Sequence, residues 1–150
     1  MLKIGRYNYR YRGRSYPTSV FVFELHDEIL EEFGGQPGFK DKGQVLSALE
    51  APTRSAGGQD AYLTFFWKVA ALGYLIIQNH GFSDANKRTA LLAMETTLQW
   101  NGQYPKWSQE TKTLTMKLVG AGHLSLEGLR FALLAACGYN VDQYDDLKEL

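Results

Sequence analysis

Hydrophobic residues recur along the chain mainly at the spacing of helices rather than of strands. The most apolar stretch covers residues 61–77 and contains few charged residues, so it predicts a buried helix. A second run of helix-favouring residues covers 89–100 and stops at Asn101-Gly102. The segment between the two runs, residues 80–88, is short and polar. The pattern therefore predicts two central helices joined by a polar loop.

Four further segments combine helical spacing of apolar residues with capping residues at their ends. They begin at Pro17-Thr18-Ser19, Asp41, Ser108 and Ser125, and they end at Gly34-Gly35, at Ala51-Pro52, near residues 120–122 and at Gly138. We expect Asp60 to cap the helix over residues 61–77, after a polar linker at residues 53–59. Six helical segments with short connections, and no convincing run of strands, predict an all-α bundle around the two central helices.

The first 19 residues have a different pattern. Tyr7, Tyr9 and Tyr11 alternate with polar residues and Arg12-Gly13 can form a turn, which predicts a short β-ribbon. Five cations also lie in this arm, before the first acidic residue of the chain. A basic, aromatic arm could contact nucleic acid or a partner. We favour the simpler interpretation of a ribbon packed on the domain or a terminal tail.

Composition narrows the class of protein. A chain of 150 residues with 45% apolar content can form one sizeable core, so we expect one domain. The net charge is zero, so we expect no direct nucleic-acid binding. Cys137 is the single cysteine and lies in an apolar run, which predicts a buried thiol in a reducing compartment. No stretch has the roughly 20 apolar residues of a membrane span or the pattern of a signal peptide, so we expect a cytoplasmic protein.

The polar loop carries the side chains of phosphate chemistry. Histidine exchanges protons near neutral pH, so His80 is the natural acceptor of a proton from a hydroxyl nucleophile. Asp84 is a lone carboxylate of the kind that suits Mg²⁺. Asn86 can bind phosphate or orient the loop, and Lys87 and Arg88 supply positive charge at the start of a helix. These features predict a site for a magnesium-bound phosphate compound.

A purely structural interpretation of the loop is also available. In that interpretation Ser83 or Asp84 caps the following helix, Phe82 anchors the loop in the core and the cations are solvated. We expect the anchoring role of Phe82 in either case. Five chemically useful side chains within nine residues are nevertheless hard to explain by capping alone.

Two other features have simple interpretations. His26 lies in the first helix with no second histidine three or four residues away, so we interpret it as a hydrogen-bonded structural residue rather than a metal ligand. Residues 34–43 are rich in glycine, but they lack the spacing of known phosphate-binding loops. We therefore expect a turn or loop there.

The loop resembles the signature of the Fic/Doc family. The residues His80-x-Phe82-x-Asp84-Ala85-Asn86-Lys87-Arg88 match the pattern HxFx(D/E)(A/G)N(G/K)R, and the lysine before the final arginine is similar to the Doc, or death-on-curing, branch. Leu25-His26-Asp27, the glycine-rich run and Trp100-Asn101-Gly102 also resemble Doc landmarks in the right order. The resemblance covers roughly residues 20–136. It divides the chain into an arm at 1–19, a Fic/Doc domain at 20–138 and an acidic tail at 139–150.

The resemblance implies a mostly helical Fic fold and a nucleotide-dependent transferase that uses ATP with Mg²⁺. His80 would be the general base and Asp84 the metal ligand, and the nucleotide would be bound by Ala85, Asn86, Lys87 and Arg88. Fic enzymes usually transfer AMP to a protein hydroxyl. Doc-type toxins instead transfer the terminal phosphate of ATP to elongation factor Tu and inhibit translation. A non-catalytic nucleotide-binding module is a third alternative.

Departures from the Fic pattern favour phosphate transfer. AMP-transferring members usually have glycine where Lys87 stands and a second arginine where Leu91 stands. Gly81 replaces the commoner proline, and we expect it to loosen the loop. The self-inhibiting pattern (S/T)xxxE(G/N) is absent from the chain. Restraint would then come from another chain, and the resemblance to Doc implies an antitoxin of the Phd type that lays a helix into an apolar groove.

Overall fold

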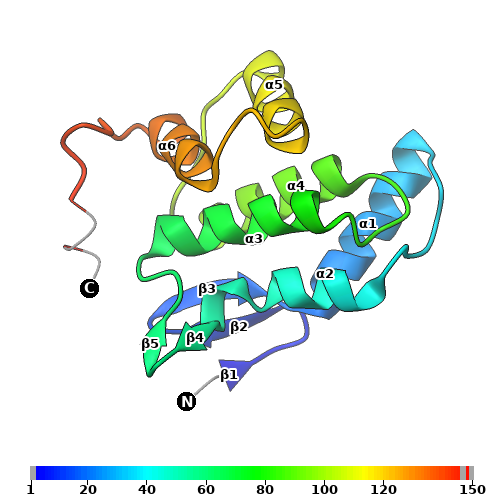
Figure 1. Cartoon of the computed structure of the whole chain (residues 1–150), viewed down its shortest axis with the longest axis horizontal. Helices are drawn as coiled ribbons and strands as arrows, with labels where there is room; N and C mark the ends of the chain where they lie inside the picture. Colours follow the sequence, from blue (N-terminus) through cyan, green and yellow to red (C-terminus); the bar gives the residue numbers. More distant parts are fainter. Residues whose placement is uncertain (1–2, 146–147, 149–150) are drawn as a thin grey trace.

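A computed structural model describes residues 3–145 and 148 of the chain. Within this part the fold is mostly helical, with a small N-terminal sheet, and the prediction of a helical bundle with a short ribbon is confirmed (Figure 1). The six described helices are α1 (Ser19–Phe33), α2 (Lys42–Leu49), α3 (Phe65–Asn79), α4 (Asn86–Trp100), α5 (Gln109–Gly120) and α6 (Leu126–Ala136). None of these helices is long and apolar enough to span a membrane.

Helix α3 is the centre of the fold. It lies between α5 and α6 on one side and α2 on the other, with α4 beside it (Figure 1). Most of its side chains are buried, including Phe66, Leu72 and Ile76. A helix that is apolar on nearly all sides is stable in water only when other elements cover every face. The surrounding helices and sheets therefore assemble around α3.

Helices α3 and α4 approach each other closely at Gly73. A Cβ atom at this position would lie 2.2 Å from the sulfur of Met94, so only glycine allows the present distance between the helices. Met94 is fully buried and fills the space that the missing side chain leaves. Because α3 ends and α4 begins at the loop of residues 80–85, this contact helps to determine where the loop lies.

Capping residues predicted from the sequence begin four of the helices. The side chains that accept a hydrogen bond from the first turn belong to Thr18, Asp41, Ser108 and Ser125. The predicted glycine end of α1 is also present, since Gly34 has a φ of 77° and its N–H bonds to Leu30 O. Local hydrogen bonding of short polar side chains explains why these ends were visible in the sequence.

The N-terminal residues form a three-stranded antiparallel sheet of β1 (Lys3–Ile4), β2 (Asn8–Tyr11) and β3 (Arg14–Pro17). Arg12 and Gly13 both have positive φ values and form the turn between β2 and β3, as predicted. Tyr16 is buried against Phe65, and the Asn101 side chain bonds both to the N–H and to the carbonyl of Ser15. The interpretation of the arm as a packed ribbon is therefore confirmed.

The cations of this sheet make contacts within the protein. Arg6 pairs with Glu24 at 3.0 Å, Arg10 bonds Ser15, and the guanidinium of Arg14 lies 4.6 Å from the centroid of the Phe65 ring. Arg6 and Arg10 are exposed. These contacts attach the basic side chains to the sheet and to its neighbours.

Asp60 does not cap the central helix, and this expectation was wrong. Helix α3 begins at Phe65 with Thr64 at the N-cap position. The segment expected to be a plain linker contains a 3₁₀ turn (Ala51–Thr53) and a hairpin of β4 (Ser55–Ala56) and β5 (Gln59–Asp60). The reason is that Lys68 of α3 is 2% exposed. A buried ammonium group without a counter-charge costs more free energy than a helix without a side-chain cap, so Asp60 pairs with Lys68 instead.

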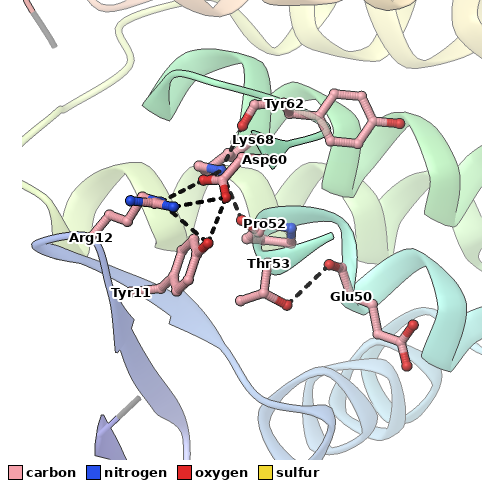
Figure 2. Close-up of polar contacts among 8 residues, drawn as sticks. All are labelled: Tyr11, Arg12, Glu50, Pro52, Thr53, Asp60, Tyr62 and Lys68. Carbon is pink, nitrogen blue, oxygen red and sulfur yellow. Dashed lines mark hydrogen bonds and ion pairs between the residues drawn. The ribbon is translucent and has the colours of Figure 1, made fainter. Parts of the chain in front are cut away.

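Lys68 and Asp60 form a buried ion pair with a distance of 2.8 Å (Figure 2). The Lys68 ammonium also donates hydrogen bonds to the carbonyl oxygens of Pro52 and Tyr62. All three of its N–H groups therefore have an acceptor, which is the condition for burying such a charge.

Two residues of the N-terminal sheet complete the cluster. Tyr11 donates a hydrogen bond of 2.6 Å to Asp60, and Arg12 pairs with the same carboxylate at 2.7 Å (Figure 2). Burial by itself raises the pKa of Asp60, but hydrogen bonds from Arg12, Lys68 and Tyr11 outweigh it and hold the pKa far below its ordinary value. The cluster joins the sheet, the β4–β5 hairpin and α3.

We expect Asp60→Asn to lower the free energy of unfolding at pH 7 by about 3 kcal/mol, because it leaves the buried Lys68 without a counter-charge. Urea denaturation measures this loss. Since the folded pKa of Asp60 is depressed, its stabilisation is present above the unfolded pKa of about 4 and is lost as the pH falls. The difference between wild type and Asp60→Asn should therefore shrink below about pH 4. Arg12→Ala, at an exposed side chain, should lower the stability much less than Asp60→Asn does.

Candidate functional site

The loop between α3 and α4 begins and ends with strained backbone. His80 caps α3 with a φ of 47°, and Ala85 precedes α4 with a φ of 62°. Residues other than glycine seldom adopt this left-handed conformation, and where they do the surrounding structure has to hold them. Ala85 makes no side-chain cap to α4, and neither Ser83 nor Asp84 occupies the N-cap position. Capping alone therefore does not explain these residues.

Phe82 anchors the loop, as predicted. Its side chain is 1% exposed and stacks on the His26 ring at a centroid distance of 3.9 Å. The Asn86 amide accepts a hydrogen bond from the N–H of Phe82 at 3.1 Å and donates one to its carbonyl at 3.0 Å. Of the two roles considered for Asn86, its side chain performs the loop-orienting one here.

The glycine-rich segment at residues 34–41 pairs with the loop. Gly81 O accepts hydrogen bonds from the N–H groups of Lys40 and Asp41, and the Ser83 N–H donates to Gly38 O. Phe39 and Phe82 form an antiparallel β-bridge and their rings stack at 5.3 Å. The segment that the sequence predicted to be a turn or loop therefore forms backbone hydrogen bonds along one edge of the loop.

Gly81 has a packing role that the sequence did not indicate. Gly81 is buried, and a Cβ atom there would lie 2.8 Å from the backbone nitrogen of Val45 and 2.9 Å from Asp41 O. A backbone group cannot move aside as a flexible side chain can. Glycine at this position allows the loop to pack directly against the start of α2.

Asp84 is held in place although it is exposed. Its carboxylate accepts hydrogen bonds from the N–H of Gln36 at 3.1 Å and from the N–H of Ala85 at 2.9 Å. These two bonds, with that from Gln36 the larger cause, lower the pKa of Asp84 below its ordinary value. The carboxylate is thereby kept in its charged form, which is the form that binds cations.

His26 also holds Asp84, through the backbone. The His26 Nε2 atom lies 2.9 Å from Asp84 O, and the His26 ring is 3% exposed. The prediction of a hydrogen-bonded structural histidine is confirmed, but its partner is the peptide of the candidate metal ligand. One signal in the sequence pointed to a partner for His26, because a polar side chain that faces the core must form a hydrogen bond.

A cleft of about 690 Å³ lies beside the loop. Its walls come from the end of α1, the start of α4 and one face of α5. They include Phe33, Gly34, Gly35, Asp84, Ala85, Asn86, Lys87, Arg88, Leu91, Leu92, Glu95, Gln109, Lys112, Thr113, Met116 and Lys117. The volume lies within the usual range for small-molecule sites.

The cleft brings together five of the six candidate site residues. Residues 84–88 all line it at the N-terminus of α4, where unpaired N–H groups and the helix dipole favour an anion. The Arg88 guanidinium lies over the Phe33 ring at 4.3 Å, and the Lys87 side chain runs beside Gly120 of α5. His80 is exposed at the other end of the loop and is not part of the cleft wall.

Asp84 can bind Mg²⁺ only if a bound phosphate compound supplies further oxygen ligands. In the described part of the chain, no group of three or more His, Cys, Asp and Glu side chains could hold a metal ion. Mg²⁺ is commonly bound through one or two carboxylates together with phosphate oxygens and water. A single oriented carboxylate at the rim of an anion site is consistent with that arrangement.

The α5 wall was not identified from the sequence. Gln109, Lys112, Thr113, Met116 and Lys117 recur at helical spacing and all face the cleft. Four of the five are polar, as is usual on the solvent side of a helix, so nothing in the sequence marks them as cleft residues. Only the packing of α5 across α4 reveals that this side lines the site.

Comparison with known proteins agrees with the fold and the loop. The model of the Fic/DOC family matches residues 16–98, so the chain belongs to this family. It is similar to "Toxin Doc" of Mycolicibacterium smegmatis (strain ATCC 700084 / mc(2)155), with 40% identity over 70 residues, which are 47% of this chain and 54% of that protein. It is also similar to "Protein kinase doc" of Escherichia phage P1, with 36% identity over 99 residues.

The extent of these matches differs. The match to the mycobacterial toxin spans about half of that protein's length. The match to the phage kinase covers 63% of this chain and 75% of the phage protein. The family model and both relatives therefore support membership of the family, with the family model ending before α5.

We expect Gly35→Ala to disturb the Asp84 carboxylate. The new Cβ atom would lie 3.0 Å from Asp84 Oδ2 and 2.8 Å from Leu30 Cδ2, so the Gln36 N–H bond should be lost or lengthened. Because that bond lowers the pKa of Asp84, the pKa should rise toward its ordinary value, as followed by carboxyl NMR during a pH titration.

The matched control is Gly58→Ala, in the turn between β4 and β5. Gly58 also has a positive φ, but nothing lies within 4 Å of its added Cβ. It should share the backbone strain without moving Asp84. An Asp84 titration that is the same in wild type and Gly35→Ala would contradict the role given to the Gln36 hydrogen bond.

Proposed function

We propose that this chain is a Doc-like toxin that transfers the terminal phosphate of ATP to a hydroxyl group of a target protein. The observation that carries the proposal is the convergence of Asp84, Lys87 and Arg88 in one cleft at the N-terminus of α4. Phosphoryl transfer requires positive charge on the phosphate oxygens and accurate positioning more than covalent chemistry. The similarity to a protein named as a kinase supports the same class of reaction.

The chemical step would use His80 as the general base. His80 is exposed at the mouth of the loop, where a hydroxyl group of another protein can reach it. The hydroxyl proton would pass to the imidazole while its oxygen forms a bond to the terminal phosphorus. The bond from that phosphorus to the bridging oxygen breaks, and ADP leaves.

The loop residues would bind the nucleotide. Lys87, Arg88 and the N–H groups near Ala85 and Asn86 would hold the phosphates, and Asp84 would hold Mg²⁺. The ion supplies charge neutralisation at the phosphate oxygens when it is bound. The hydrogen bonds of the Asn86 side chain to Phe82 suggest that Asn86 contributes through the shape of the loop.

AMP transfer is the second candidate function, because many Fic proteins perform it. Two residues of the cleft favour phosphate transfer instead. Lys87 stands where AMP-transferring members usually have glycine, and Leu91 stands where they have a second arginine. Leu91 lines the cleft, so that wall is apolar where the arginine would bind phosphate.

The biological partners follow from the resemblance. We propose elongation factor Tu or a similar translation protein as the target, with inhibition of translation in the cytoplasm as the result. An antitoxin of the Phd type would neutralise the toxin by laying a helix into an apolar groove. The similarity to "Toxin Doc" supports this part of the proposal.

Transfer from labelled ATP distinguishes the two reactions. With ATP labelled on the terminal phosphate, we expect label on the target protein, and with ATP labelled on the innermost phosphate we expect none. Label that moves only from the innermost phosphate would refute the kinase proposal and favour AMP transfer.

His80→Ala tests the general base. We expect the rate of transfer to fall by at least about 100-fold, because general-base catalysis typically contributes this much. The matched control is His123→Ala, at an exposed histidine between α5 and α6, which should retain full activity and toxicity. Undiminished toxicity of His80→Ala would support a non-catalytic binding module instead.

Lys87→Gly tests the charge at the start of α4. We expect phosphate transfer to slow by about tenfold to 100-fold, since the ammonium group stabilises charge on the phosphate oxygens. Steady-state kinetics with the labelled ATP measures it. Lys106→Ala, at an exposed lysine outside the cleft, is the control. An unaltered rate in Lys87→Gly would rule out this role for Lys87.

A further inference from the structure

The cleft continues well beyond the phosphate-binding loop. It follows α4 from Arg88 at the N-terminal turn to Glu95, two turns further on. Seven residues of helix correspond to roughly 10 Å. Phosphate groups bound at the start of α4 would leave this distal part for another portion of the ligand.

Helix α5 faces α4 across the cleft and contacts it near both ends. At one end the Lys87 side chain lies against Gly120, and at the other end Lys112 pairs with Glu95 at 3.4 Å. The two helices therefore form opposite walls, with the C-terminal part of α5 facing the start of α4. Lys117 belongs to the cationic end of the cleft.

The chemistry of the cleft changes along its length. Lys87, Arg88 and Lys117 make the first end cationic. Leu91 and Met116 are almost fully buried and provide an apolar floor in the middle. Glu95, its ion-pair partner Lys112 and Gln109 make the far end polar. A nucleotide has the same order of properties, with charged phosphates at one end and a flat base with polar edges at the other.

Glu95 is fixed in position at the far end. The Trp107 indole N–H donates a hydrogen bond of 3.0 Å to Glu95 Oε2, and Lys112 approaches the same oxygen at 3.4 Å. The Glu95 side chain is 13% exposed, so little water reaches it. Among the described residues no donor bonds to Oε1. Glu95 Oε1 can therefore accept a hydrogen bond from a ligand, and the carboxylate that carries it is fixed in position.

We propose that Glu95 recognises the base of the bound nucleotide by accepting a hydrogen bond from its amino group. This inference rests on the proposed function, in which the phosphates occupy the start of α4. Glu95 and Lys112 pair at the far end, so this end has no excess of positive charge for phosphate, and Glu95 Oε1 suits an N–H donor. Leu91 and Met116 would lie against the ribose or the base.

Glu95 would thereby act as a specificity-determining residue of the ATP site. Adenine presents an amino group at its six position, which is the donor that this carboxylate lacks. A site that hydrogen-bonds a ligand group rejects the analogue without it, because the buried acceptor then has no partner. The hydrogen bond to a charged acceptor should change affinity by about tenfold or more.

The test measures binding of three probes by isothermal titration calorimetry in the presence of Mg²⁺. The probes are ATP, purine riboside triphosphate and inorganic tripolyphosphate. Purine riboside triphosphate keeps the ring and the sugar of ATP but lacks the amino group. Tripolyphosphate keeps only the phosphates. The proteins are the wild type, Glu95→Ala, Glu95→Gln and the control Glu28→Gln, at an exposed glutamate of α1 outside the cleft.

We expect the wild type and Glu28→Gln to bind ATP about tenfold more tightly than purine riboside triphosphate. Glu95→Ala should bring the two affinities to near equality and leave the affinity for tripolyphosphate unchanged. Glu95→Gln preserves the size of the side chain and should lower the preference as well, because its carbonyl can stay with Trp107 and its NH₂ then faces the amino group. This second variant serves if Glu95→Ala does not fold.

Two results would overturn the inference, and they differ in what they say of the proposed function. The first result is that all three probes bind, but the wild type does not prefer ATP or both Glu95 variants keep the preference. In that case Glu95 does not recognise the base, and the proposed phosphate site is unaffected. If none of the three probes binds, the proposed function fails and the inference fails with it. A purely structural Glu95 would weaken all probes alike through loss of folded protein, which circular dichroism detects.

Discussion

The close packing of α3 against α4 is the contact on which the rest of the structure depends. Helix α3 is apolar on nearly every face, so it must be covered, and Gly73 lets Met94 of α4 approach it more closely than any side chain would allow. The loop that joins these two helices carries the candidate chemistry. Its position is therefore determined by the core and not by the loop alone.

Three independent attachments then give the loop its shape. Phe82 enters the core, and its N–H and carbonyl are both hydrogen-bonded to the Asn86 amide. The glycine-rich segment at 34–41 pairs with the loop backbone, and His26 contacts the carbonyl oxygen of Asp84. Left-handed backbone at His80 and Ala85 is tolerated because these attachments hold it. The result presents a charged carboxylate and two cations in one cleft, with an imidazole exposed at the loop's other end.

The charged cluster of Asp60 and Lys68 lies near the start of α3, away from the loop that follows its end, and has a different role. Neither residue lines the cleft at the start of α4, and all N–H groups of Lys68 have acceptors, so the cluster serves the fold. The cluster shows how a strong electrostatic arrangement differs from a ligand site. In the cleft, by contrast, Lys87 and Arg88 remain exposed, and the remaining polar groups converge on open space.

The sequence by itself determined the helices, their caps and the composition of the motif loop, because these depend on neighbours within a few residues. Thr18, Asp41, Ser108 and Ser125 cap helices as predicted, and the run from His80 to Arg88 identified the family. The role of Asp60, the tight packing of Gly81 and the α5 wall of the cleft were decided only by the tertiary structure. Each depends on a residue distant in the sequence, namely Arg12 for Asp60, Val45 for Gly81 and Lys112 for Glu95, and no local pattern encodes such pairings.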